Sequence, residues 1–77
     1  MAAIKEHERV ILTKTMPGER LESGDVGTVV LVHDGLGYEV EFVALDGETL
    51  AVASVFSQQV RPIGHQEIAH ARPLNVA

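Results

Sequence analysis

Residues 24–43 decide the fold of this chain. They read Gly24-Asp-Val-Gly-Thr-Val-Val-Leu-Val-His33, then Asp34-Gly-Leu-Gly37, then Tyr38-Glu-Val-Glu-Phe-Val43. Two runs rich in β-branched and aromatic residues flank four residues that favour a turn, and this pattern is typical of an antiparallel hairpin. The hairpin offers the other short apolar runs of the chain a sheet on which to pair.

The second run shows which of its faces is buried. Tyr38, Val40 and Phe42 alternate with Glu39 and Glu41, and successive side chains of a strand point to opposite faces. The first run is apolar on both faces, with Val26, Thr28, Val30 and Val32 on one and Gly27, Val29, Leu31 and His33 on the other. We therefore expect something other than water to cover part of its outer face.

Composition indicates one small domain with an aliphatic core. The chain has 77 residues, of which 45% are apolar, yet it holds only two Phe, one Tyr and no Trp. A domain of this size buries only about 60% of the surface of its unfolded chain, so each large apolar residue matters. A core of Val, Leu and Ile favours strands over helices.

The charge balance disfavours nucleic acid as a partner. Six Lys and Arg stand against eleven Asp and Glu, a formal charge of −5, which repels phosphate unless the cations gather on one face. The chain has no cysteine and hence no disulfide or thiolate metal site. No apolar run approaches the ~20 residues of a membrane span, and the first residues lack the apolar core of a signal peptide, so we expect a cytoplasmic protein with no membrane contact.

Four further elements follow from local signals. Residues 9–13 form a first strand, and Leu21 anchors a long loop over residues 14–24. Asp46-Gly47 is a tight-turn signal that leads into a strand over 49–55. A single helical turn capped by Ser57 then precedes a last strand over 60–63, which Pro62 confines to a sheet edge or to a strand end.

These elements divide the chain into three parts. Residues 1–8 are a polar lead-in, residues 9–63 are the domain, and residues 64–77 are a tail in which 67–72 can form one or two helical turns before Pro73. Five short strands, a long first loop and a one-turn helix before the last strand indicate an all-β fold, a small five-stranded SH3-like barrel.

Several stretches together resemble a known family. They are Arg9-Val-Ile-Leu12, Gly24-Asp-Val-Gly-Thr-Val-Val30, Tyr38-Glu-Val-Glu-Phe42, Asp46-Gly-Glu-Thr-Leu-Ala-Val52 and Val60-Arg-Pro62. In these the chain is similar to short bacterial proteins grouped as domain of unknown function 4926. The resemblance covers residues 9–63 and implies the fold. It implies no reaction, because the family has no established catalytic residues to transfer.

No motif predicts a catalytic, cofactor or metal site. Glu39 and Glu41 lie about 7 Å apart on one strand face, a separation that a glycosidase could use, but such alternation is more typical of a solvated face. The four His lack the spacing of a zinc site, and Ser23, Ser54 and Ser57 lack a nucleophile motif. The glycines of the hairpin are followed by no Lys-Ser or Lys-Thr, so we interpret them as turn and bend residues.

The predicted facing leaves an apolar set outside the barrel. The interior holds ten residues: Val10, Leu12, Val26, Val30, Val32, Tyr38, Val40, Phe42, Leu50 and Val52. The outward set, and so the predicted interface, is Ile11, Val29, Leu31, Ala51, Ala53 and Val55. A contiguous apolar patch usually marks an interface. Two alternatives stay open, a bulge near Gly27 that reverses Val29 and Leu31, and a tail that folds back with Ile68, Leu74 and Val76.

Three classes of function therefore remain. The first is a protein-binding module or accessory subunit that acts through a protein partner or self-association, such as an acidic partner of a basic protein. The second is a nucleic-acid-binding SH3-like barrel, for which Lys14, Arg20 and Arg61 must share one face. The third is a small enzyme with an unrecognised site. Charge and the lack of motifs favour the first, without cofactor.

Overall fold

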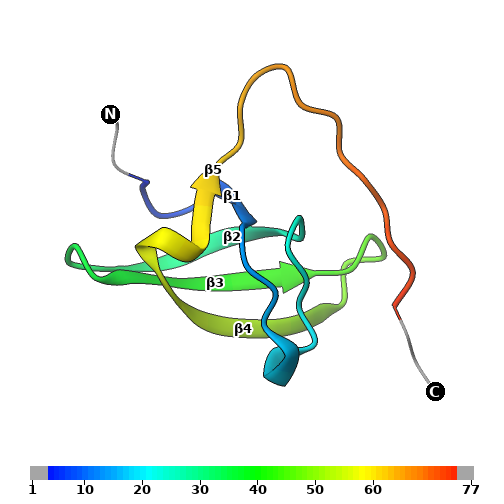
Figure 1. Cartoon of the computed structure of the whole chain (residues 1–77), viewed down its shortest axis with the longest axis horizontal. Helices are drawn as coiled ribbons and strands as arrows, with labels where there is room; N and C mark the ends of the chain where they lie inside the picture. Colours follow the sequence, from blue (N-terminus) through cyan, green and yellow to red (C-terminus); the bar gives the residue numbers. More distant parts are fainter. Residues whose placement is uncertain (1–3, 75–77) are drawn as a thin grey trace.

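The structure is a computed structural model that describes residues 4–74 and consists of one five-stranded antiparallel sheet (Figure 1). Its elements are β1 (Arg9–Leu12), η1 (Pro17–Glu19), β2 (Val26–His33), β3 (Gly37–Val43), β4 (Thr49–Phe56), η2 (Ser57–Gln59) and β5 (Val60–Pro62). The strands lie in the order β4-β3-β2-β1-β5, and η1 and η2 are single 3-10 turns. The predicted all-β SH3-like barrel with a one-turn helix before the last strand is confirmed.

The short strand β1 joins β5 to the rest of the sheet. Val10 pairs with Gly27 of β2 on one side and with Pro62 of β5 on the other. The strand β5 therefore lies at the end of the sheet, as its proline predicts. The lead-in extends this pairing, because His7 N–H donates to the Val29 carbonyl and Val29 N–H donates to the Glu8 carbonyl.

The core is aliphatic, with one aromatic ring at its centre. Its buried residues are Val10, Leu12, Leu21, Val29, Val40, Phe42, Ala53, Val55 and Val60. The loop anchor Leu21 is 3% exposed, which confirms its prediction. Gly27 lies beneath Phe42 and Val40 so closely that an added Cβ would collide with both side chains. The close approach of two core residues, and not a bulge at this position, explains this glycine.

The first half of β2 faces the opposite way from the prediction. Val29 pairs with Val40 and Leu31 pairs with Glu39, which leaves Val30 between them without a partner in the ladder. Such a one-residue bulge interrupts the alternation of the strand, so residues before and after it do not follow one regular inward and outward pattern. Val29 is consequently buried, whereas Val26 and Val30, predicted to be inside, are exposed.

The facing of β4 is also the reverse of the prediction. Ala53 and Val55 are buried and Ala51 packs against the core, whereas Leu50 and Val52 are exposed. Three of the six predicted interface residues, Val29, Ala53 and Val55, thus belong to the core. Of the other three, Leu31 is exposed, and Ile11 and Ala51 are half-buried.

Two local predictions about helical turns are wrong. The side chain of Ser57 does not cap η2; instead Phe56 N–H donates to the Gln59 side-chain oxygen at 2.7 Å. Residues 67–72 form no helix, because Glu67 turns back to accept from Gly64 N–H and from Arg61. The tail instead leaves β5 in an arch and descends beside the β3–β4 turn (Figure 1). Val76 lies outside the described residues.

Candidate functional site

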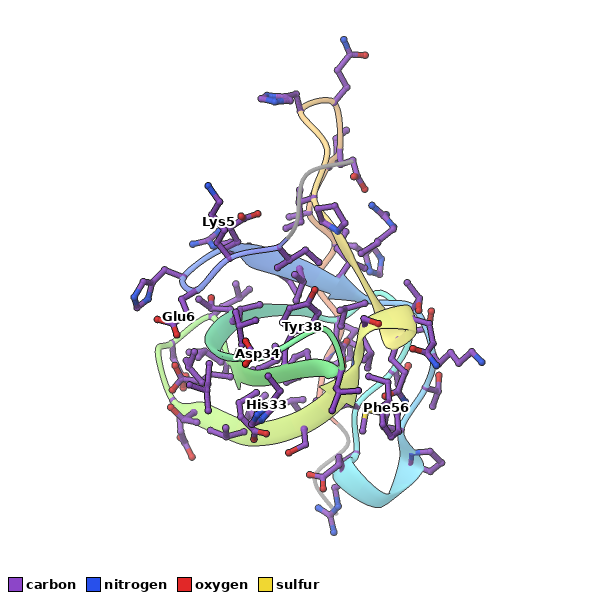
Figure 2. The ribbon with its side chains drawn as sticks, turned by 90° about the vertical axis from the view of Figure 1, so that its left-hand side faces the viewer. Lys5, Glu6, His33, Asp34, Tyr38 and Phe56 are labelled. Atoms are coloured by element: carbon purple, nitrogen blue, oxygen red, sulfur yellow. The ribbon has the colours of Figure 1, made fainter. Side chains whose placement is uncertain are left out.

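Exposed apolar side chains gather on the outer side of the sheet near the β2–β3 turn. We call this surface the outer patch, and it consists of Leu31, Leu36, Glu39, Val52, Ser54 and Phe56. Strand pairing makes it continuous, since Leu31 lies opposite Glu39 and Glu39 opposite Ser54. In Figure 2 this end of the molecule faces the viewer, and His33 and Phe56 lie on the opposite side of the β3 ribbon from Tyr38.

The apolar members of the outer patch are large and accessible. Leu36 is 73% exposed, Phe56 64%, Val52 55% and Leu31 45%. A shallow hollow of about 270 Å³ lies between Leu36 and Phe56, with Glu39 and Ser54 on its wall. A soluble domain rarely leaves large apolar side chains side by side on a sheet face unless something covers them.

One carboxylate organises the polar part of the outer patch. Glu39 Oε2 accepts a hydrogen bond from Ser54 Oγ at 2.5 Å and another from His33 Nε2 at 2.7 Å. The Ser54 hydroxyl and, after it, the His33 ring hold the pKa of Glu39 below its usual range. The carboxylate therefore stays ionised beside the apolar side chains at neutral pH.

Ser54, Glu39 and His33 are residue types that serve nucleophilic catalysis, and no sequence motif indicates their convergence. Their order differs from that of a catalytic triad, in which the histidine stands between the serine and the carboxylate. Here the carboxylate stands between the other two. The geometry thus fixes a negative charge and gives Ser54 a weak base in place of an imidazole.

The other sequence candidates do not converge. Glu41 shares a face with Glu39 but accepts from Thr49 Oγ1 at 2.7 Å. The lowered pKa of Glu39 is the opposite of what the general acid of a glycosidase needs. Within residues 4–74, no three His, Asp or Glu side chains are grouped as a metal ion requires.

A second hollow lies at the opposite end of the same strands, beneath the tail. This groove of about 640 Å³ is bounded by the start of β2, the end of β3, the β3–β4 turn and residues 69–74. Its barrel side includes Phe42, Leu45 and Leu50 as apolar surface. We call it the tail groove.

An arginine of the tail closes this groove. Arg72 Nε donates to Asp25 Oδ1 at 2.7 Å and Arg72 Nη2 donates to Asp25 Oδ2 at 2.8 Å. The two side chains retain only 25% and 16% of their accessible surface. The Arg72 guanidinium holds the pKa of Asp25 below its ordinary value, and burial opposes this effect only in part.

Of the three cations that the nucleic-acid hypothesis needs, Arg61 is paired with a carboxylate of its own chain. Arg61 donates to both carboxylate oxygens of Glu67, at 2.8 and 2.7 Å, and this pair lowers the pKa of Glu67 to about 2. Arg72 is held by Asp25, with Glu22 Oε2 at 3.4 Å. Two of the six Lys and Arg thus face carboxylates of the same chain.

One signal in the sequence locates the outer patch correctly. Counting outward from the Asp46-Gly47 turn places Phe42 opposite Ala51 and Val40 opposite Ala53, as the structure has them. Directly opposed residues share a face. Val52 and Phe56 must then point outward, beside Glu39 and Glu41.

Comparison with known proteins adds one finding. A family model described as "Domain of unknown function (DUF4926)" matches residues 6–62, which is more than half of the chain. No curated protein and no solved structure matches. Over residues 4–74, no helix has the length and apolar character needed to cross a membrane.

Proposed function

The chain belongs to this family, and because the family's description assigns no activity, we propose from the surface that it is a protein-binding module whose outer patch docks a basic protein. The observation that carries the proposal is the position of an ionised carboxylate, Glu39, among exposed Leu31, Val52 and Phe56. Apolar anchors beside a fixed charge are what specific protein interfaces combine.

Charge identifies the kind of partner. The chain carries −5 overall, and Glu39 and Glu41 lie on the same side of the sheet as the apolar side chains. A partner with Lys or Arg around an apolar pocket complements this surface and is drawn to it at long range. A second copy of the chain would bring like carboxylates together, so an unlike partner is favoured over self-association. The proposed setting is the cytoplasm.

Binding is favoured over catalysis by the arrangement at Glu39. The hydroxyl of Ser54 donates to a carboxylate of lowered pKa, which is a poor general base. Nucleic acid is disfavoured because Arg61 and Arg72 face carboxylates of their own chain.

A photo-crosslinking experiment in the native cells tests the proposal. A photoreactive amino acid replaces Leu36 in the patch or, as control, Ile68 in the tail, which is 97% exposed. We expect one basic protein to be linked from position 36 and not from position 68. Absence of a position-36 adduct would contradict the proposal.

Reconstitution with the purified partner then tests the residues. Phe56→Ala should weaken binding by at least about tenfold, as truncation of an aromatic anchor does. The control Ile68→Ala, also a large exposed apolar residue, should leave affinity unchanged. Binding should weaken as salt rises. Equal affinity of Phe56→Ala and the native chain would exclude the outer patch as the docking surface.

A further inference from the structure

The tail is held on the barrel mainly by polar contacts. Ile68 is 97% exposed and Leu74 is 41% exposed, so neither is a buried anchor. The polar contacts that hold the tail are the pair Arg61–Glu67 at its root and, at its far end, those of Arg72 with Asp25, with Glu22 and with the Arg20 carbonyl. Such a segment can leave its place without opening the core.

The carboxylate that receives Arg72 is positioned by the barrel. Asp25 Oδ2 accepts from Glu22 N–H at 2.8 Å, and the Asp25 carbonyl accepts from Leu12 N–H at 2.9 Å. Asp25 lies within the residues that match the family model, whereas Arg72 lies beyond them. The acceptor thus belongs to the domain, and the tail only occupies it.

We propose that the tail groove is a binding site for an extended, arginine-bearing segment of another protein, and that the tail occupies it as an intramolecular competitor. The carboxylate of Asp25 offers both oxygens to one guanidinium, in the parallel arrangement that suits arginine and that the point charge of lysine cannot satisfy. The proposal does not depend on the outer patch.

The rest of the groove matches such a ligand. The barrel lines it with three carboxylates, Asp25, Glu41 and Asp46, against one cation, Arg9. Exposed Leu45 and Leu50 supply apolar surface on the same wall. A basic segment in extended conformation, with an apolar residue near its arginine, complements both features, and residues 69–74 already lie there without helix or strand.

Binding of a synthetic peptide with the sequence of residues 64–74 tests the proposal on the full-length chain. In the native chain the attached tail competes at high effective concentration, so we expect weak binding. The Arg72→Ala chain should bind the peptide at least about fivefold more tightly, because its own tail no longer reaches Asp25 with a guanidinium. Fluorescence anisotropy of the labelled peptide measures both.

Matched variants test whether the peptide binds in the groove through its arginine. The Arg72→Ala peptide should not bind, and a Lys peptide should bind less well than the Arg peptide. In the Arg72→Ala chain, Asp25→Asn should abolish the gain while it keeps an acceptor for Glu22 N–H, whereas Glu19→Gln, on η1 outside the groove, should not. Phe56→Ala, which disables the outer patch, should leave peptide binding intact, so the two proposals can fail separately.

Three results would overturn the proposal. The first is equal affinity of the native and Arg72→Ala chains for the peptide. The second is equal binding of the Arg and Ala peptides. The third is dimerisation of the native chain that Arg72→Ala abolishes, seen by light scattering, because this would assign the groove to the tail of a second copy.

Discussion

Val40 on β3 lies directly opposite Ala53 on β4, and both side chains are almost completely buried. The next pair on the same face, Phe42 opposite Ala51, repeats the arrangement of a large residue against a small one. Because opposed side chains share a face and compete for the same space, the alanines of β4 make room for Val40 and Phe42. The larger side chains on the other face of β4 then contact solvent or a partner.

This relationship predicts unequal effects of two valine truncations. Val40→Ala should destabilise the domain by about 1–3 kcal/mol, because it empties a buried site. Val52→Ala should change stability by less than about 0.5 kcal/mol, since Val52 is exposed. Urea unfolding of the two variants measures the difference. Equal losses would mean that β4 faces the other way.

Gly27 predicts a second contrast. A methyl group at this position would collide with Val40 and Phe42, so Gly27→Ala should cost about 1–3 kcal/mol through overpacking. Gly18→Ala is the matched control, because nothing lies within 4 Å of a Cβ placed there. Thermal melts of both variants test the pair. A Gly27→Ala variant as stable as Gly18→Ala would show that β2 and β3 pack loosely at this point.

The two arginine–carboxylate pairs predict separable changes of pKa. Arg72→Ala should raise the pKa of Asp25 toward its ordinary value of 3.8 and leave Glu67 near 2. Arg61→Ala should do the reverse, raising the pKa of Glu67 toward 4.5. Titration followed by NMR of the carboxyl carbons reports each group. A shift of both groups in both variants would mean that the tail detaches as a whole.

These pairs also determine how the stability of the folded chain changes with pH. A carboxyl whose pKa is lower in the folded chain than in the unfolded chain contributes fully above its unfolded pKa. Its contribution disappears as pH falls through the folded value. Stability of the native chain should therefore decline below about pH 4, and less steeply in Asp25→Asn. Urea melts between pH 7 and pH 3 test this. If the free energy of unfolding falls equally steeply with pH in both chains, the pair Arg72–Asp25 does not contribute to stability.

The acidic surface predicts the response to nucleic acid. The chain should not bind duplex DNA or single-stranded RNA at physiological salt, because it is acidic and two of its arginines face carboxylates. Anisotropy titrations with labelled oligonucleotides measure this. Salt-sensitive binding in the low micromolar range would restore the nucleic-acid hypothesis.

Most elements of this fold can be predicted from the sequence because they carry a local signal. The alternation from Tyr38 to Phe42, the Asp46-Gly47 turn and Pro62 each specify one step of the chain. The positive φ of Gly47, 94°, is what the turn requires. Local chemistry is therefore sufficient to predict the strands and the two hairpins.

The size of the side chains does not predict which face of a strand is buried. On β4 the larger residues, Leu50 and Val52, suggest a buried face, but packing against Val40 and Phe42 requires the smaller ones. On β2 an unpaired residue reverses the alternation, and no local signal in Val29-Val-Leu31 distinguishes a bulge from a regular strand. The tail groove is closed by contacts of Arg72 with residues 47 and 52 positions away, which periodicity does not reveal.

The bulge at Val30 has an evolutionary consequence. Val29 and Leu31 already pair with neighbouring residues of β3, Val40 and Glu39, and Val30 is 40% exposed. A related chain that lacks this one position would keep the same ladder, with Val29 still inward and Leu31 still outward, and would lose mainly the local bend. Insertions and deletions of one residue are thus absorbed here without any change in the core. Alignment gaps among related chains should fall at this point, because the strand can gain or lose this residue without changing which side chains it buries.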